Sequence, residues 1–368
     1  MIPVARPTLG KEEIKNIEKI CKTGWLGMGS LVFEFENVLK KMFGRKHAIC
    51  VNTGTAAIHI ALAASGIGRG DEVIVPSLTF AGTIQPILSC GARPVFCDIE
   101  LEDLNLSMDH LKRLLTKKTK AILPVHYGGV PCNMDLILRI ARKDGLRVIE
   151  DAAHAFGSEY KNRLIGSFGD IACFSFDPIK TISCGEGGAV VLDDDECAQK
   201  ITKMRILGID KDTWNRYHQK RSWLYEVQME GYRYHMSNIN AAIGLAQIKK
   251  FKVFKKRRQD IAKFYDKELS RLKHIRILRH DLESTVPFNY TILADKRDLL
   301  MHFLKTKGIV TAINYIPNHI QPFFRRKRVA LPNTDFAYNR IIGIPLYSSL
   351  SINEARFVVG SIKEFYKR

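Results

Sequence analysis

The chain has 368 residues, of which 46% are hydrophobic and 26% are charged. This length allows a large domain plus a smaller one, and the composition excludes a disordered or fibrous chain. The net charge of +19 suits nucleic acid or a polyanionic small molecule, but the 57 Lys and Arg residues are spread widely and no recognisable nucleic-acid module accompanies them.

The N-terminal residues lack the basic and then apolar layout of a signal peptide. No stretch of about eighteen apolar residues suggests a membrane span. We therefore expect a cytoplasmic protein. The eight cysteines are scattered without a CxxC pair, which favours buried free thiols over disulfides and predicts no metal site.

Apolar residues at spacings of three and four predict helices within residues 12–43, interrupted by GWLGMG at 24–29. Short apolar strands then alternate with helices, which indicates a mainly parallel sheet covered on both faces. Ligands of such sheets bind beyond the carboxyl ends of the strands. The expected strands are 48–51, 72–75, 94–97, 121–125, 147–150, 172–176 and 189–192, and the expected helices include 56–64 and 81–89.

After residue 245 the pattern changes to that of a smaller α+β domain. A basic helix is expected at 251–272, with KKRR at 255–258 on its solvated face. A strand at 286–293 and a helix at 296–307 follow. We therefore divide the chain into a large domain, 1–247, and a small domain, 248–368. A second dense basic run, RRKR, occupies 325–328.

Lys180 and Asp151 carry the strongest chemical signal. Lys180 follows the strand at 172–176, and Asp151 directly follows the strand at 147–150. A lysine amine can form a Schiff base with the aldehyde of pyridoxal phosphate (PLP). A carboxylate can keep the pyridine nitrogen protonated, so that the ring accepts electrons. The two residues together predict a PLP enzyme.

Other features suit PLP, although each also has a plainer structural explanation. The run NTGTAA at 52–57 opens a helix, where backbone N–H groups can bind a phosphate. Phe80 can stack on the ring or belong to the core. His154 can bond to the phenolic oxygen or simply pack. Ser175 can donate to the phosphate or face a neighbouring layer, and Glu186 lies in a glycine-rich turn.

These motifs, in this order, resemble the DegT/DnrJ/EryC1/StrS family of PLP-dependent nucleotide-sugar aminotransferases. The resemblance covers nearly the whole chain. It implies an α/β protein of PLP-dependent transferase fold type I, in which helices sandwich the mainly parallel sheet of the large domain. The matching segments are GWLGMG at 24–29, FEF at 33–35, NTGTAA at 52–57, PSLTF at 76–80, EDAAH at 150–154, GSFGD at 166–170, FSF at 174–176 with Lys180, EGG at 186–188, and GYRYHMSN at 231–238.

The resemblance implies roles for single residues at the cofactor. Lys180 would bind the aldehyde and Asp151 the pyridine nitrogen. Phe80 matches the aromatic that stacks on the ring, and His154 matches the position near the ring hydroxyl. The phosphate contacts would come from these donors: the hydroxyl of Ser175 and the amides of Thr55 and Ala56.

The resemblance also implies a homodimer, in which a neighbouring subunit completes each site. Arg233 stands where the family often has an Asn that reaches the partner's cofactor phosphate, and His235 replaces an Arg. Asn314 occupies a position where many members have His. The candidates for binding substrate are Trp25, Glu186, Tyr315 and His319.

The run TISCGEGG after Lys180 is similar to the corresponding run of family members that act at C-4 of the sugar. Members that act at C-3 tend to have KNLG, beginning at the lysine, followed by GDGG. The implied reaction moves an amino group from L-glutamate to C-4 of a 4-keto-6-deoxy sugar nucleotide, with C-3 amination as an alternative. Two hypotheses of a different kind also stay open. One is a sugar dehydratase of the same fold, which has His at the lysine position. The second is a non-catalytic regulatory protein.

Overall fold

The computed structural model describes residues 1–210, 224–325 and 329–367. Its centre is a seven-stranded sheet in the order β1-β9-β8-β5-β4-β2-β3. Strands from β3 to β8 pair in parallel, while β9 is antiparallel to both β1 and β8. The prediction of a mainly parallel sheet is confirmed. The strands are β1 (His47–Val51), β2 (Glu72–Pro76), β3 (Arg93–Cys97), β4 (Thr119–Ile122), β5 (Arg147–Asp151), β8 (Ile171–Ser175) and β9 (Gly188–Leu192).

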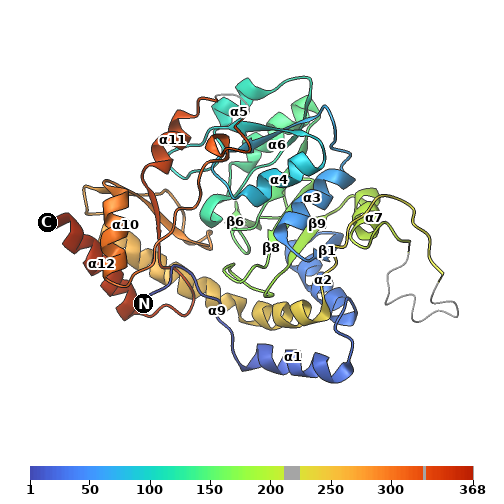
Figure 1. Cartoon of the computed structure of the whole chain (residues 1–368), viewed down its shortest axis with the longest axis horizontal. Helices are drawn as coiled ribbons and strands as arrows, with labels where there is room; N and C mark the ends of the chain where they lie inside the picture. The colour runs from blue at the N-terminus through green and yellow to red at the C-terminus, as the bar shows by residue number, and fades with distance from the viewer. Residues whose placement is uncertain (211–223, 326–328, 368) are drawn as a thin grey trace.

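Helices cover both faces of this sheet (Figure 1), which explains the consecutive apolar residues within most of its strands. One face is covered by α3 (Gly54–Ala64), α4 (Ala81–Ser89) and α7 (Asp195–Met204). The opposite face is covered by α2 (Ser30–Phe43), α5 (Met108–Leu114), α6 (Met134–Asp144) and the first part of α9 (Asn238–Leu269).

The helical stretch expected at 12–43 is two helices, α1 (Lys11–Thr23) and α2. Gly24 ends α1 in the left-handed conformation, with φ of 71°, which glycine adopts without a steric penalty. The glycine-rich interruption in the sequence therefore marks a true break, and it turns the chain so that α1 packs along α9 (Figure 1).

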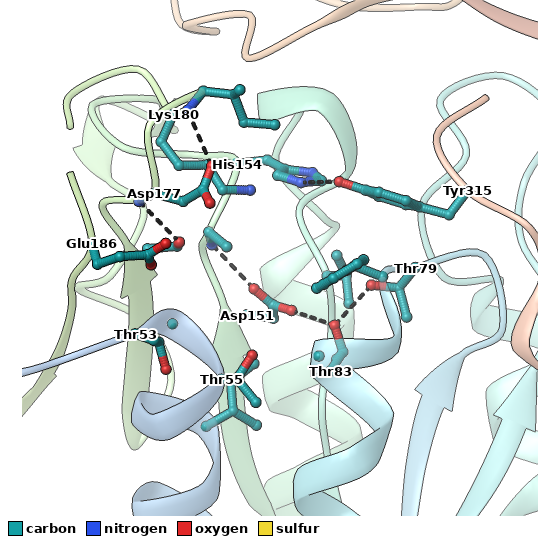
Figure 2. Close-up of a pocket in the computed structure, with 18 residues that line it drawn as sticks. Thr53, Thr55, Thr79, Thr83, Asp151, His154, Asp177, Lys180, Glu186 and Tyr315 are labelled. Carbon is teal, nitrogen blue, oxygen red and sulfur yellow. Dashed lines mark hydrogen bonds between the residues drawn. The ribbon is translucent and has the colours of Figure 1, made fainter. Parts of the chain in front are cut away.

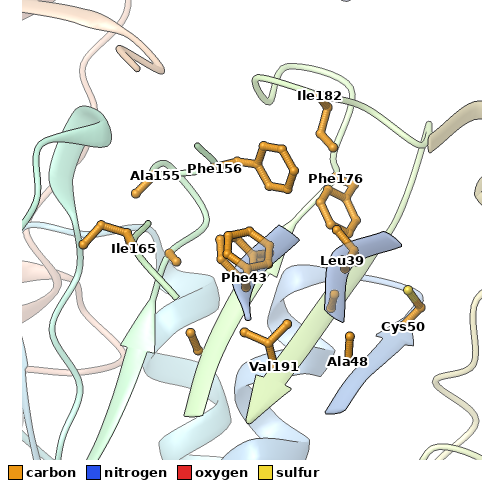
Figure 3. Close-up of a cluster of buried hydrophobic side chains, with 14 of the residues drawn as sticks. Leu39, Phe43, Ala48, Cys50, Ala155, Phe156, Ile165, Phe176, Ile182 and Val191 are labelled. Atoms are coloured by element: carbon orange, nitrogen blue, oxygen red, sulfur yellow. The ribbon is translucent and has the colours of Figure 1, made fainter. Parts of the chain in front are cut away.

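Aromatic side chains fill the core between α2 and the sheet (Figure 3). The rings of Phe43 and Phe174 stack with centroids 4.5 Å apart, and Phe156 meets both edge-on. Phe176 also meets Phe156 edge-on, with ring centroids 5.9 Å apart. This packing holds β8 and the first residues after it in place, and the loop that carries Lys180 begins there.

The C-terminal part forms a second layer around a three-stranded antiparallel sheet. Its apolar core also takes in the last turns of α9. Ile2 pairs with Ile309, so the N-terminal residues lie beside this part of the molecule. The elements are β10 (Ile275–Ile277), β11 (Tyr290–Ala294), α10 (Arg297–Thr306), α11 (Pro332–Tyr338), β12 (Ile341–Ile344) and α12 (Ile352–Lys367), and a small hairpin of β6 (Glu159–Tyr160) and β7 (Arg163–Leu164) lies earlier in the chain.

Helix α9 begins at Asn238, well before the expected 251, and runs unbroken past residue 248. The division into 1–247 and 248–368 remains a prediction, since one helix belongs to both parts. Within the described ranges, no helix combines the length and apolar character needed to cross a membrane.

The prediction that KKRR at 255–258 lies on a solvated face is wrong for Arg258. This side chain is buried, and its Nη1 donates to the carbonyl oxygens of Pro287 at 3.2 Å and Phe288 at 2.9 Å. Burial lowers the pKa of the guanidinium to about 10. Arg258 therefore anchors the segment that carries Phe288. Of the second basic run, residues 326–328 lie outside the described residues.

Six cysteines are buried free thiols, as expected, but Cys21 is exposed and Cys90 is half-buried. Cys21 lies near the end of α1, on a helix whose other face contacts α9. Cys184, which is close to Lys180 in sequence, is fully buried, and burial raises the pKa of its thiol. We therefore assign Cys184 a packing role.

Candidate active site

A cavity of about 300 Å³ opens at the carboxyl edge of the large sheet (Figure 2). The segments that follow β1, β2, β5 and β8 line it, as expected for a ligand site in a parallel sheet. Most of the residues singled out in the sequence lie on its wall: Thr55, Phe80, Asp151, His154, Ser175, Lys180, Glu186 and Tyr315.

Lys180 lies in the loop after β8, and its Nζ is 4.3 Å from the centroid of the Phe288 ring. Burial lowers the pKa of this amine to about 8, although the carboxylates of Asp151 and Asp177 oppose the shift. An amine acts as a nucleophile or base only when it is neutral. The environment of Lys180 therefore makes a usable fraction of neutral amine available near physiological pH.

Asp151 ends β5 and is buried at the base of the cavity. Its Oδ2 accepts a hydrogen bond from Thr83 Oγ1 at 2.7 Å, and its Oδ1 accepts one from the Ala153 amide at 3.1 Å. Burial raises the pKa of this carboxyl group, while these hydrogen bonds and the nearby Lys180 oppose the rise. Asp151 is thus a fixed carboxylate that can pair with a cationic group in the cavity.

His154 lies between two aromatic rings at the side of the cavity. Its Nε2 is 3.0 Å from the hydroxyl of Tyr315, and its ring stacks on Phe288 with centroids 4.1 Å apart. Burial, and the charge of Lys180, hold the pKa of His154 well below its usual value, so the imidazole is neutral. Its Nδ1 is buried and has no partner among the described residues. Because His154 lines the cavity, this buried nitrogen can take its partner from a ligand.

The N-terminus of α3 and Ser175 form a polar, concave end of the cavity. Thr53 caps α3 by accepting a hydrogen bond from the Ala56 amide at 3.0 Å. In the described part of the chain, no hydrogen bond engages the amides of Gly54 and Thr55. A Cβ on Gly54 would lie 2.7 Å from Ser175 Cβ, so only glycine permits this close approach. Free amides at a helix N-terminus beside a serine hydroxyl suit a phosphate.

The model of the DegT/DnrJ/EryC1/StrS aminotransferase family matches residues 7–363. The chain belongs to this family. Among its relatives, the spore coat polysaccharide biosynthesis protein SpsC of Bacillus subtilis is 39% identical over 378 residues, which cover 100% of this chain and 97% of SpsC.

Solved structures of several aminotransferases share the whole fold. Spr1654 of Streptococcus pneumoniae, in its pyridoxamine phosphate (PMP) form, has a TM-score of 0.94 at 26% identity, covering 100% of this chain and 99% of Spr1654. The sugar aminotransferase CalS13 of Micromonospora echinospora has a TM-score of 0.91 at 29% identity, covering 99% of this chain and 100% of CalS13. The fold class predicted from the sequence is confirmed.

The cavity of this aminotransferase fits PLP group by group. Lys180 can meet the aldehyde, Asp151 the pyridine nitrogen, and the orphaned Nδ1 of His154 the phenolic oxygen. The free amides at the start of α3, with the hydroxyl of Ser175, form a phosphate cradle that a Cβ on Gly54 would close. Each polar group of PLP thus has a complementary group in the cavity.

Phe80 lies at the cavity mouth and is 59% exposed, which is unusual for a large aromatic side chain. Gly82 follows it closely, and a Cβ there would lie 2.8 Å from the Phe80 ring and 2.6 Å from Thr55 Oγ1. The absence of a side chain at Gly82 therefore leaves room for the Phe80 ring at the start of α4. An exposed, flat aromatic surface at a cavity suits stacking on another ring.

We expect Gly54→Ala to weaken PLP binding by more than about tenfold, since the added methyl group must displace Ser175 or the start of α3. Gly360→Ala is a matched control, because a Cβ at Gly360 in α12 would meet no atom within 4 Å. Equilibrium dialysis of PLP against each purified variant measures the effect. Equal affinity of the Gly54 variant and the control would contradict the cradle.

The structure does not bring every predicted residue to the cavity. The amide of Ala56 donates to the helix-capping hydroxyl of Thr53. The free amides are therefore those of Gly54 and Thr55. Arg233 is exposed and lies outside the cavity of its own chain. Trp25 is half-buried, and its Nε1 donates to the carbonyl of Met28 at 2.9 Å, within the turn between α1 and α2.

His319 is buried in a structural contact outside the cavity. Its Nδ1 is 2.8 Å from Ser77 Oγ and its Nε2 is 3.1 Å from Asp335 Oδ1. The short turn Asn318–Ile320 thereby ties the segment of Tyr315 to the loop after β2. His319 positions this segment and does not line the cavity.

Sequence reasoning missed several residues of the cavity wall. Thr83 lies in the first turn of α4, which follows β2, and it donates a hydrogen bond to Asp151. The expectation that ligands bind at the carboxyl ends of parallel strands, which selected Asp151 after β5, also applies to the residues after β2. Asp177 lies between Ser175 and Lys180, and its charge acts on the amine. Its signal in the sequence is a carboxylate three residues before Lys180, in the same short loop after the strand.

Proposed function

We propose that this aminotransferase uses PLP to transfer the amino group of L-glutamate to C-4 of a nucleotide-linked 4-keto-6-deoxy sugar. The observation that carries the proposal is the meeting of Lys180, Asp151 and the α3 cradle in one cavity. The relatives support a sugar substrate, since SpsC is a polysaccharide biosynthesis protein and CalS13 is a sugar aminotransferase. The run TISCGEGG after Lys180 supports action at C-4.

The residues that line the cavity have different roles in the proposed reaction. Bound PLP supplies an electron sink for the charge that develops at the donor's α-carbon. Asp151 would keep the ring nitrogen of bound PLP protonated. Lys180, neutral in part because its pKa is about 8, would take up the α-proton of glutamate at its Nζ and act as the general base. The Phe288 ring excludes water from the side of Lys180 and His154.

Two further carboxylates support a hydroxyl-rich substrate. Asp177 and Glu186 both line the cavity. Burial, together with the charge of Asp177, raises the pKa of Glu186. Carboxylates accept hydrogen bonds from hydroxyl groups, and a deoxy sugar offers several. We assign Glu186, with Asp177, to the sugar side of the cavity, and Tyr315 to the opposite wall.

We further propose a cytoplasmic homodimer with shared active sites. Among the lining residues that the structure describes, Lys180 is the sole Lys or Arg, whereas the cofactor phosphate and the donor carboxylates bring several negative charges. Arg233 is exposed, and a second copy can supply it to the cavity. Light scattering should give twice the chain mass, and Arg233→Ala should weaken PLP binding. A monomeric active enzyme would contradict the shared site.

The position of amination is tested with the enzyme in its PMP form. We offer it 4-keto-6-deoxy sugars linked to UDP, GDP or dTDP and expect it to aminate at least one of them. NMR of the product should show the new nitrogen on C-4. The matched 3-keto sugar nucleotides should stay unchanged. Amination of a 3-keto sugar alone would overturn the C-4 assignment and leave the aminotransferase activity in place.

A further inference from the structure

Two buried threonines, one in α4 and one just before it, lie beside Asp151 (Figure 2). Thr83 Oγ1 lies 2.7 Å from Asp151 Oδ2, and Thr79 Oγ1 lies 2.9 Å from Thr83 Oγ1. Each threonine is 2% exposed. We propose that Thr79 and Thr83 form a hydroxyl chain that fixes Asp151 as the acceptor for the ring nitrogen of the cofactor. This inference rests on the proposed use of PLP.

The direction of the chain follows from the protons available. An ionised carboxylate only accepts hydrogen bonds, so the single hydroxyl proton of Thr83 must point to Asp151. Thr83 then has only lone pairs to offer Thr79, so Thr79 is the donor in the contact between the two hydroxyls. Both O–H dipoles are aligned toward the carboxylate, and aligned hydrogen bonds strengthen one another.

The surroundings hold this chain rigidly. The Ala153 amide donates to the second oxygen of Asp151, so both oxygens have fixed orientations. Asn318 Nδ2 donates to the carbonyl of Thr79 at 2.7 Å. The segment that carries Tyr315 into the cavity thus also fixes Thr79, the outer member of the hydroxyl pair.

The consequence concerns the charge on Asp151. A protonated Asp151 cannot keep the pyridine nitrogen protonated, and burial favours the protonated form by raising the pKa. The hydroxyl of Thr83 opposes that effect by donating to the ionised form. Thr83 and Thr79 are therefore positioning residues that act through Asp151.

The test compares two ligands on the full-length enzyme. One is PLP and the second is its deaza analogue, in which CH replaces the ring nitrogen while the aldehyde, phenol and phosphate remain. For Thr83→Val, which keeps the shape of the side chain, we expect the affinity for PLP to fall roughly tenfold relative to that for the analogue. Thr79→Val should show a smaller loss, of about threefold. Thr83→Ser, which keeps the hydroxyl, should restore the preference for PLP.

The outcomes separate the inference from the proposed function. An equal loss of affinity for both ligands in Thr83→Val would overturn the inference, because Thr83 would then only shape the cavity. Thermal unfolding of each variant establishes that the comparison is made on folded protein, and Thr83→Ser supplies a second folded variant. Failure of the unchanged enzyme to bind PLP would contradict the cofactor assignment, and the inference with it.

Discussion

Replacement of Lys180 by alanine is expected to abolish transamination, with turnover reduced on the order of 10⁴-fold or more. The variant loses both the nucleophile that holds the cofactor and the base that moves the α-proton. No second lysine lies on the described wall of the cavity to replace it. The measurement is the rate of 2-oxoglutarate formation from glutamate in the presence of a keto sugar nucleotide.

Lys252→Ala provides the control, because Lys252 is exposed on α9 and lies outside the cavity. That variant should keep the turnover of the unchanged enzyme. A Lys180→Ala enzyme that retained turnover within about tenfold of normal would be incompatible with general-base catalysis by this lysine.

Asp151→Asn should lower turnover by about 10²- to 10⁴-fold at saturating PLP. Asparagine keeps the shape of the side chain and a carbonyl acceptor for Thr83, but it removes the negative charge that pairs with the ring nitrogen. Loss of one partner of a buried ion pair costs roughly 3–5 kcal/mol, which corresponds to the stated range of rates. Steady-state kinetics with glutamate measures the effect.

The matched control for Asp151 is Asp109→Asn, since Asp109 is an exposed residue of α5 with a lysine neighbour. We expect no change in turnover for that variant. If Asp151→Asn transaminated as fast as the control, the ring nitrogen would not depend on this carboxylate, and the assigned role of Asp151 would be wrong.

The sheet and its functional edge could be predicted because both depend on local patterns. Strands such as β5 and β8 are almost wholly buried and therefore contain consecutive apolar residues. Chain order then places Asp151 at the carboxyl end of β5 and Lys180 in the loop after β8. These two positions needed no knowledge of how distant segments pack.

Residues whose roles depend on distant partners could not be predicted in the same way. Arg258 occurs in a run of four basic residues, and only the packing of α9 against the segment at Pro287 shows that it is buried. His319 follows Tyr315 by four residues, yet its partners are Ser77 and Asp335, so it faces away from the cavity. Such assignments require the tertiary structure.

The visible absorption spectrum of the purified enzyme, before and after addition of glutamate alone, tests the central claim most directly. We predict an absorption band of PLP bound to Lys180, which glutamate converts into the band of pyridoxamine phosphate. That change would establish both the cofactor and the donor half of the reaction. A protein that shows no chromophore even after PLP is added, or a band that glutamate leaves unchanged, would contradict the account.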